Sequence, residues 1–290
     1  MAKSAWTDAL SELLRVGPGF ALAGLDPDST PGFPGGKKDG EAALEAGRAE
    51  LNDLQERLWA ASRFGGTRSL LLVIQAMDTA GKGGIVQHVM GGITPEGLHA
   101  YAFTKPTEEE LSHDFLWRVR KQLPAAGMIG VFDRSHYEDV LIARVHSLVP
   151  ADQLEQRYGQ IRSFEEELAT AGTTIVKVML HISADEQKAR LADRLDRVEK
   201  QWKFNPEDLT ERALWASYME AYQIAVERTS VGTAPWFVIP ANAKWYARAA
   251  VQQILLETMR GLDLGWPTVD YDIAAEKQRL VEPVETSPTT

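Results

Sequence analysis

The 290-residue sequence contains no cysteine. Disulfides, thiolate metal sites and cysteine nucleophiles are therefore excluded. The sequence also lacks an apolar run of the roughly 18–20 residues that a bilayer-spanning helix needs. Its first residues, MAKSAWTDALSELLRV, carry no apolar segment followed by a cleavage site, which a secretory signal would require. We therefore expect a cytoplasmic protein that does not act in a membrane.

The sequence also has fewer basic than acidic residues, 31 Lys and Arg against 41 Asp and Glu. The formal net charge is -10, which argues against non-specific binding to nucleic acid or to an anionic membrane. A polyanionic ligand is still compatible with this charge, because binding depends on where the Lys and Arg residues cluster. The chain is 44% hydrophobic and 25% charged, which is typical of a soluble globular protein with a sizeable core.

What is present is an alternation of apolar strands and amphipathic helices. The sequence predicts strands at 69–75, 98–103, 128–133, 173–182 and 234–241. It predicts helices at 41–62, after the loop that follows the first strand, and at 107–123, 135–147, 151–171 and 189–203. Such alternation is typical of an α/β fold with a mainly parallel sheet flanked by helices. We expect an N-terminal arm (1–45), one domain (46–265) and a C-terminal tail (266–290), with the end of the tail, 281–290, disordered.

A glycine loop, QAMDTAGKGG (75–84), follows the first strand and opens a helix. Gly81 and Lys82 fit the phosphate-loop pattern G-x-x-x-x-G-K-[ST], but Ala76 and Gly83 depart from it and Asp78 lies inside it. Backbone N–H groups and a helix N-terminus form an anion site, and Lys82 adds a positive charge. The alternative is an ordinary turn between strand and helix. The predicted phosphate or nucleotide contacts here are Thr79, Ala80, Gly81, Gly83 and Gly84.

A second motif, MIGVFDRSHYED (128–139), ends a buried strand in an acid. Ligands of parallel sheets gather at the carboxyl ends of strands, where Asp78 and Asp133 would both lie. A carboxylate near phosphate is repulsive unless a cation lies between them, and Mg²⁺ prefers one or two carboxylates plus phosphate oxygens. We predict that Asp78 and Asp133 hold Mg²⁺ or Mn²⁺, and that Arg134 and Lys82 act directly on the transferred group. The alternative for Asp133 is a residue that caps the next helix.

Arginines on one helix form the third candidate feature. Arg190, Arg194 and Arg197 have i, i+4, i+7 spacing and so share a helix face. Bidentate binding of several phosphates needs such a row, and we predict that it belongs to a helical lid at about 184–210. The alternative is a solvated helix with internal ion pairs. Lys203 and Arg144 are further predicted phosphate or nucleotide contacts.

With these segments placed, the chain resembles the second family of polyphosphate kinases, the polyphosphate kinase 2 family. The resemblance rests on MDTAGKGG, FDRSHYEDVLIARVH, RLDR…KQWKF and APWFVIPANAKWY, and it runs over roughly 45–265. It implies a phosphate-loop (P-loop) kinase fold with a helical lid, Mg²⁺, and a homo-oligomer such as a dimer or tetramer. SHYEDVL is similar to the class III branch, which accepts nucleoside mono- and diphosphates. Members that use AMP often have Asn at the position of Asp133, so the balance between AMP and ADP stays open.

The resemblance implies reversible transfer of the terminal phosphoryl group of inorganic polyphosphate to AMP or ADP, or to GMP or GDP. Because the attacking phosphate oxygen is already ionised, we expect positioning and charge neutralisation to carry the reaction, without a strong general base. Two alternatives stay open on the residues alone. One is an ATP-dependent nucleoside or nucleotide kinase, and the other is a non-catalytic nucleotide-binding regulator.

Overall fold

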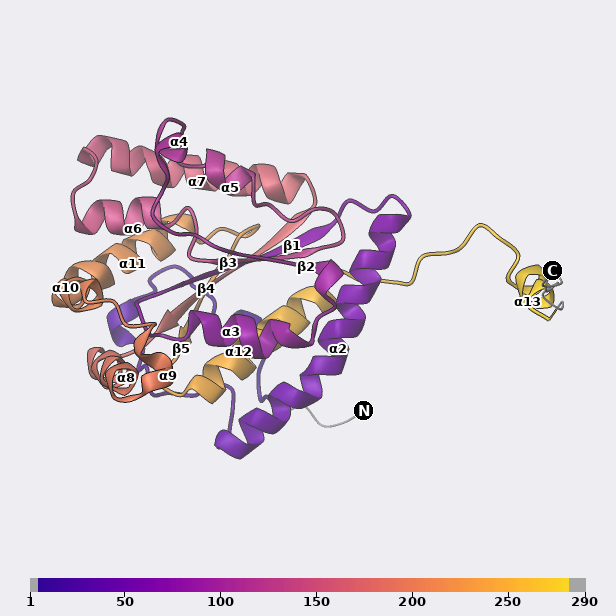
Figure 1. Ribbon diagram of the computed structural model, residues 1–290, viewed down its shortest axis with the longest axis horizontal. Helices are drawn as coiled ribbons and strands as arrows, with labels where there is room; N and C mark the ends of the chain where they lie inside the picture. The colour runs from indigo at the N-terminus through magenta and orange to yellow at the C-terminus, as the bar shows by residue number, and fades with distance from the viewer. Residues whose placement is uncertain (1–4, 282–290) are drawn as a thin grey trace, which may run out of the picture.

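A computed structural model describes residues 5–281, so the predicted disorder of the tail lies outside the described residues except for Val281. Within them, a parallel five-stranded sheet has the order β2-β3-β1-β4-β5 (Figure 1). The strands are β1 (Ser69–Ala76), β2 (Leu98–Ala102), β3 (Ile129–Asp133), β4 (Thr173–His181) and β5 (Trp236–Pro240). The α/β prediction is confirmed, and each strand lies within one or two residues of its predicted bounds.

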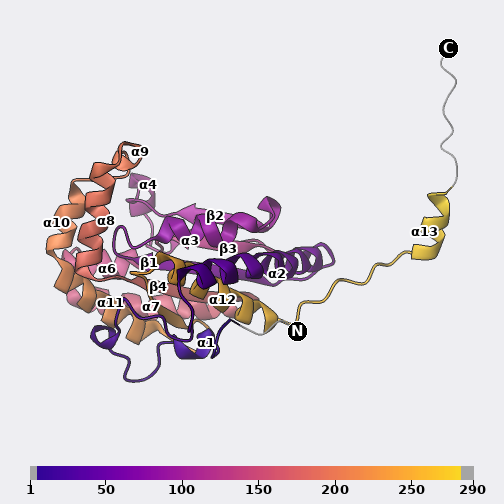
Figure 2. The same ribbon diagram turned by 90° about the horizontal axis from the view of Figure 1, so that it is seen from below.

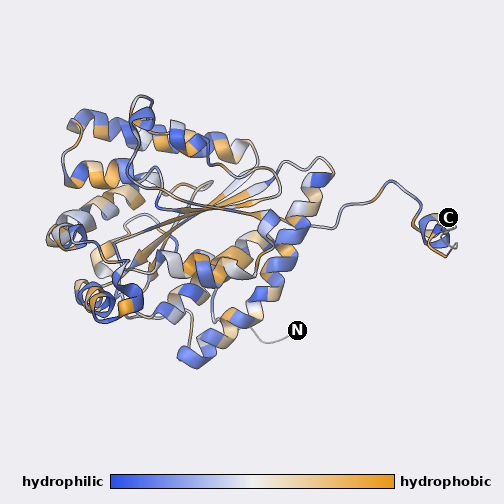
Figure 3. Ribbon diagram, in the orientation of Figure 1, coloured by the Kyte–Doolittle hydropathy of each residue, from blue (hydrophilic) through white to orange (hydrophobic). Residues whose placement is uncertain are grey.

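The helices cover both faces of this sheet (Figure 1). One face packs against α2 (Lys37–Arg63), α3 (Lys82–Val89) and α12 (Lys244–Arg260). The other packs against α6 (Glu138–Val145), α7 (Ala151–Thr170) and α11 (Trp215–Thr229). Successive side chains of a strand point to opposite faces, so Leu70 and Leu72 enter the first core while Leu71 and Val73 enter the second. The helices accordingly show mixed apolar and polar faces in Figure 3.

The register of the central strands decides where the functional residues meet. Ile74 of β1 pairs with Asp133 of β3, and Ala76 pairs with Leu180 of β4. The carboxyl ends of these strands therefore lie side by side, and the loops that leave them share one edge of the sheet. The glycine loop and the segment after Asp133 are neighbours for this reason.

Two predicted helices are broken in the structure. The helix predicted at 107–123 forms only as α4 (Glu108–Leu111) and α5 (Trp117–Arg120). Thr107 caps α4 as predicted, but the Asp114 carboxylate accepts the Leu116 N–H at 3.0 Å. A side chain that bonds the backbone locally competes with the helix. The helix predicted at 189–203 is interrupted at Arg197, where the backbone is extended, between α8 (Ala184–Asp196) and α9 (Val198–Gln201).

Helices α8, α9 and α10 (Glu207–Ala213) project beyond the edge of the sheet that carries the glycine loop, with α9 at the tip (Figure 2). The remaining short elements are α1 (Leu10–Leu13), η1 (Leu22–Gly24), η2 (Met90–Gly92), η3 (Pro95–Gly97) and α13 (Ile273–Arg279). The N-terminal arm packs tightly, since Leu10, Leu14 and Phe33 are buried in the first core. No helix among residues 5–281 combines the length and apolar character needed to cross a membrane.

Candidate active site

A cleft of about 530 Å³ opens at the carboxyl edge of the sheet. It brings together most of the residues that the sequence predicts for the site. Those that line it are Asp78, Thr79, Ala80, Gly81, Lys82, Gly83, Gly84, Asp133, Arg134, Arg194 and Lys203. Three predicted residues, Arg144, Arg190 and Arg197, do not line it.

The glycine loop owes its shape to helix α8. Gln187 donates to the carbonyl of Asp78 at 3.2 Å, and Arg190 donates to the carbonyls of Thr79 and Ala80 at 3.0 and 2.7 Å. In a trans peptide the N–H points opposite to the C=O. Holding these carbonyls toward α8 therefore directs the N–H groups of Thr79 and Gly81 away from it. This arrangement, followed by the N-terminus of α3, is suited to binding an anion.

Two non-glycine residues in the site have a left-handed backbone. Thr79 has φ +66° and Arg134 has φ +65°. Such conformations cost about 1–3 kcal/mol each and persist only where the surroundings enforce them, commonly at functional sites. At Thr79, the hydrogen bonds from Arg190 to the loop carbonyls hold the backbone in this conformation. At Arg134, the backbone N–H donates to the Ile74 carbonyl at 3.0 Å.

The charged groups at the base of the cleft are only partly paired. Lys82 Nζ donates to the Ala76 carbonyl at 2.9 Å, and Arg134 Nη2 donates to Asp78 Oδ1 at 3.0 Å. Within residues 5–281 no hydrogen bond or ion pair holds the Asp133 side chain, although its charge acts on Arg134, and no three or more acidic or histidine side chains are placed to share a metal ion. Two carboxylates, one of them free, fit a Mg²⁺ ion that takes its other ligands from phosphate and water.

The two glycines after Lys82 differ in their surroundings. A Cβ added at Gly83 would meet nothing within 4 Å, so space does not require glycine there. A Cβ at Gly84 would lie 3.5 Å from Arg248 Nη2. Crowding therefore does not explain why position 83 lacks the usual Ser or Thr.

Lys244 and Arg248 line the cleft although sequence reasoning did not select them. They lie one turn apart at the start of α12, directly after β5. Burial and the nearby Arg190 both lower the pKa of Lys244 and of Arg248. The signal that could have found them is their position, because ligands gather after the carboxyl ends of parallel strands. With Lys82, Arg194 and Lys203 they give one local concentration of positive charge on an acidic protein.

The three predicted arginines outside the cleft have other contacts. Arg190 is buried, and its remaining N–H groups donate to Glu186 at 2.7 Å and to the carbonyls of Ala241 and Asn242 at 2.7 and 2.9 Å. With every donor occupied, it serves in this structure as a strut between α8 and the loop, which does not favour phosphate binding. Arg197 is exposed and pairs with Glu199 and Asp193, and Arg144 pairs with Glu155.

A smaller cavity of about 200 Å³ adjoins the cleft at Asp78 and Arg134. Its other walls come from α6, from the 205–211 segment and from α11. Tyr218 and Tyr222 supply aromatic surface, and carboxylates come from the acids of these segments, Glu138, Glu207, Asp208 and Glu211. Burial raises the pKa of Glu138, and Arg134 and Lys82 only partly oppose it.

A parallel sheet whose first strand ends in a Gly-Lys loop, with a free acid at the end of the neighbouring strand, defines the class of P-loop phosphotransferases. Within that class, the chain belongs to the polyphosphate kinase 2 family, whose model matches residues 35–264. The predicted family resemblance is therefore confirmed.

Individual relatives agree with this assignment. An AMP/ADP-polyphosphate phosphotransferase of Meiothermus ruber is 48% identical over 258 residues, covering 89% of this chain and 94% of the relative. An ADP-polyphosphate phosphotransferase of Rhodopseudomonas palustris is 42% identical, covering 87% of this chain and 91% of the relative. The crystal structure of polyphosphate kinase 2 from Arthrobacter aurescens is 58% identical, with a TM-score of 0.95 over 98% of this chain and 100% of that one.

Proposed function

We propose that this protein is an enzyme that moves the terminal phosphoryl group of inorganic polyphosphate to AMP or ADP. The observation that carries the proposal is the cleft around Lys82, where cations outnumber the acids on an otherwise acidic chain. A long polyanion needs such a path of positive charge, whereas one small nucleotide does not. Membership of the family and the names of the two relatives support the same donor and acceptors.

The reaction that we propose is an in-line displacement. A phosphate oxygen of the acceptor attacks the terminal phosphorus of polyphosphate, one anhydride P–O bond breaks, and the chain leaves shortened by one unit. Lys82, the loop N–H groups and Arg134 would neutralise the transferred group, while Arg194, Lys244 and Arg248 would hold the rest of the chain. No strong base is needed, because the attacking oxygen is already ionised and catalysis rests on positioning and charge.

The smaller cavity is our proposed site for the acceptor. It meets the cleft at Asp78 and Arg134, where the acceptor phosphate has to arrive. Tyr218 and Tyr222 offer ring surface for a base, and carboxylates such as Glu211 can accept hydrogen bonds from the exocyclic amino group of adenine or guanine. Both nucleoside mono- and diphosphates, as in the class III branch, are compatible with a cavity that opens directly onto the cleft.

We further propose that Asp133, joined by Asp78 once Arg134 has turned to phosphate, holds a Mg²⁺ or Mn²⁺ ion. The ion would neutralise phosphate oxygens. Residues 184–210 would act as the lid, since they carry Arg194 and Lys203 to the cleft from the projecting helices (Figure 2). The domain bounds, the cytoplasmic location and assembly as a dimer or tetramer stay predictions.

Initial rates with polyphosphate as the sole phosphoryl donor test the proposal. We expect product with both AMP and ADP, and the comparison with GMP and GDP measures the base preference. Turnover only when ATP replaces polyphosphate would favour an ordinary nucleotide kinase. Binding of nucleotide without turnover from either donor would favour a regulator.

A further inference from the structure

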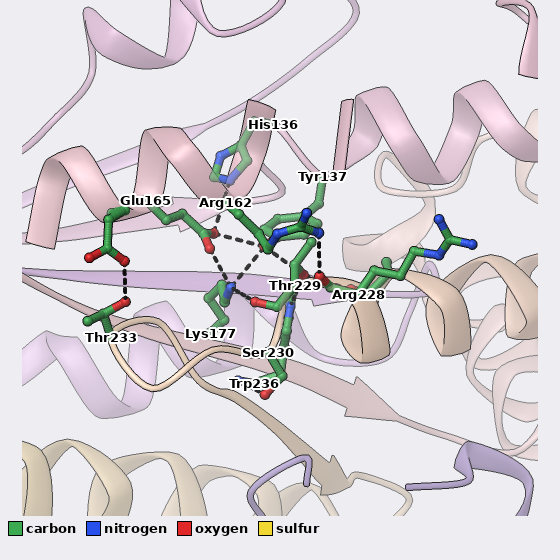
Figure 4. A network of polar contacts seen from close by, with 12 residues as sticks. His136, Tyr137, Arg162, Glu165, Lys177, Arg228, Thr229, Ser230, Thr233 and Trp236 are labelled. Atoms are coloured by element: carbon green, nitrogen blue, oxygen red, sulfur yellow. Dashed lines mark hydrogen bonds and ion pairs between the residues drawn. The ribbon is translucent and has the colours of Figure 1, made fainter. Parts of the chain in front are cut away.

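A second group of charged side chains is sealed inside the protein, on the sheet face that packs against α6, α7 and α11 (Figure 4). Lys177 lies in the middle of β4, between Ile175 and Met179, which both enter the second core. Its partner is Glu165 of α7, and the two side chains are 0% and 1% exposed. Neither touches the cleft, and nothing in the proposed reaction uses them directly.

The hydrogen bonds of Lys177 are complete, whereas the buried His136 Nδ1 beside it has no partner among the described residues. Lys177 Nζ donates to Glu165 Oε2 at 2.6 Å, to Tyr137 Oη at 2.9 Å and to the Thr229 carbonyl at 2.8 Å, so all three ammonium protons are used. Tyr137 Oη lies 2.8 Å from Glu165 Oε1, to which it donates, and 3.0 Å from Thr229 Oγ1. Trp236 Nε1 also donates to Thr229 Oγ1, at 2.8 Å. Four separate elements and the segment before α6 therefore meet at one point.

A buried ion pair does not by itself indicate a gain in stability. Burial lowers the pKa of Lys177, which Glu165 opposes. Burial alone would raise the pKa of Glu165, but Lys177 and His136 outweigh it and hold that pKa below its usual range. Lys177 Nζ lies 2.6 Å from Glu165 Oε2, the geometry of an ion pair, and removing two charges from water costs several kcal/mol per ion. Apolar side chains of similar volume often give equal or greater stability, so a buried pair invites a search for what it positions.

Tyr137 connects the cluster to the cleft. It lies three residues after Arg134, whose backbone has φ +65° and whose side chain donates to Asp78. Between them, Ser135 Oγ accepts the Tyr137 N–H at 3.1 Å and contacts Gln75 at 3.0 Å. The short segment is therefore fixed at the Arg134 end by bonds to β1 and the glycine loop, and at the Tyr137 end by the sealed cluster.

We propose that Glu165 and Lys177 are positioning residues for phosphoryl transfer, which hold the backbone of Arg134 in place by fixing Tyr137, while the Arg134 side chain stays free to turn from Asp78 to phosphate. The inference rests on the proposed function, in which Arg134 neutralises the transferred group. A strained residue keeps its conformation only when the surrounding structure over-determines it. The buried pair constrains the backbone of Arg134 from the core side of the segment. It does not reach the cleft, so it does not compete with substrate for the Arg134 side chain.

The decisive variant replaces both charges, Glu165→Leu with Lys177→Met. It removes both charges of the ion pair, and the Tyr137 hydroxyl keeps Thr229 Oγ1 as an acceptor. Among residues 5–281, Glu165 is also the only hydrogen-bond partner of the buried His136 side chain, so His136→Leu is added in a parallel variant. We expect a folded protein by circular dichroism, a kcat reduced about 10- to 100-fold because small misplacements cost that much, and KM values within about threefold. The matched control, Arg120→Met with Glu167→Leu, removes an exposed bidentate pair between α5 and α7 and should leave kcat unchanged.

A double-mutant cycle shows whether the pair acts through Arg134. If it does, adding the double replacement to Arg134→Ala lowers kcat no further than Arg134→Ala alone. Losses that multiply, or an unchanged kcat in the double replacement, overturn the proposal. Should the double replacement fail to fold, Tyr137→Phe carries the same test, because it keeps the ring and removes the link; an unchanged kcat there overturns it too.

The same data separate this inference from the proposed function. Failure of the positioning role leaves the wild-type protein fully active with polyphosphate. A wild-type protein that transfers no phosphoryl group from polyphosphate to AMP or to ADP overturns the proposed function, and the positioning role with it. An active wild type with an unaffected Arg134→Ala variant overturns the role of Arg134 and of the pair behind it.

Discussion

The cleft around Lys82 and the sealed cluster around Lys177 each centre on a lysine, yet their pairing is opposite. Lys82 has one partner among the described residues, the carbonyl of Ala76, and it stands among further cations. Lys177 has three partners, one of them the carboxylate of Glu165. In the cleft, which is open to water and ligands, Lys82 and the neighbouring cations keep positive charge that an anion can neutralise. In the buried cluster, the chain itself supplies all three hydrogen-bond partners of Lys177.

The largest effect should come from breaking the sealed pair on one side only. Lys177→Met leaves Glu165 buried without its cation, which typically costs about 3–5 kcal/mol. Urea unfolding followed by fluorescence should show this loss, and Glu165→Leu added to Lys177→Met should restore most of it. A single replacement that is no less stable than wild type would show that the cluster is not sealed.

In the cleft the same kind of replacement should affect rate and not stability. Lys82→Met removes the cation nearest the transferred group, and we expect kcat/KM with polyphosphate and ADP to fall by about 10²–10³, or about 2.7–4 kcal/mol. Lys188→Met, on the exposed side of α8, is the control. A Lys82→Met protein that is greatly destabilised would contradict the distinction between Lys82, which serves the reaction, and Lys177, which serves the folded structure.

Arg248 is a second cation of the cleft, and its replacement separates polyphosphate binding from the chemical step. Arg248 lines the cleft beside Gly84, and in the proposed reaction it holds the polyphosphate chain, so we expect Arg248→Ala to weaken polyphosphate binding without altering the chemical step. The KM for polyphosphate should rise about tenfold, or about 1.4 kcal/mol, and the effect should shrink at high salt. Arg279→Ala, on α13, serves as the control. A lowered kcat at an unchanged KM would contradict this division of roles.

Glu138 lines the smaller cavity beside Asp78 and Arg134, and its titration should make the stability of the protein depend on pH. Its raised folded pKa means that the stability it contributes is present below the unfolded pKa and is lost as pH rises through the folded value. Glu138→Gln does not titrate, so its Tm should exceed that of wild type at about pH 7.5, and the gain should vanish near pH 4. A gain that grows on acidification would reverse the sign that burial predicts.

Gly83 should give the smallest effect. A Cβ there meets nothing, so Gly83→Ser should change the free energy of unfolding by no more than about 0.5 kcal/mol. We expect the rate to change by less than about tenfold, since the proposed metal ligands are Asp78 and Asp133. A large gain in rate would mean that the missing hydroxyl limits metal binding after all.

The sequence predicts well those features that depend on local pattern. Apolar runs locate all five strands, and the Gly-Lys loop and the strand-ending Asp133 fall at the same edge because parallel strands align their carboxyl ends. Arg190 shows the limit: its spacing assigns a helix face, but only the fold shows that the face meets the loop carbonyls. Lys177 and Glu165 show it again, because an ion pair inside two apolar patterns has no local signature.

The central claim is that the cleft transfers phosphoryl groups from polyphosphate. The most direct test is ³¹P NMR of one sample that contains the purified protein, polyphosphate, Mg²⁺ and ADP, with no other phosphoryl donor. The account predicts that ATP resonances grow while polyphosphate shortens, and that Lys82→Met suppresses both changes. A wild-type sample in which polyphosphate stays intact and no ATP forms would contradict it.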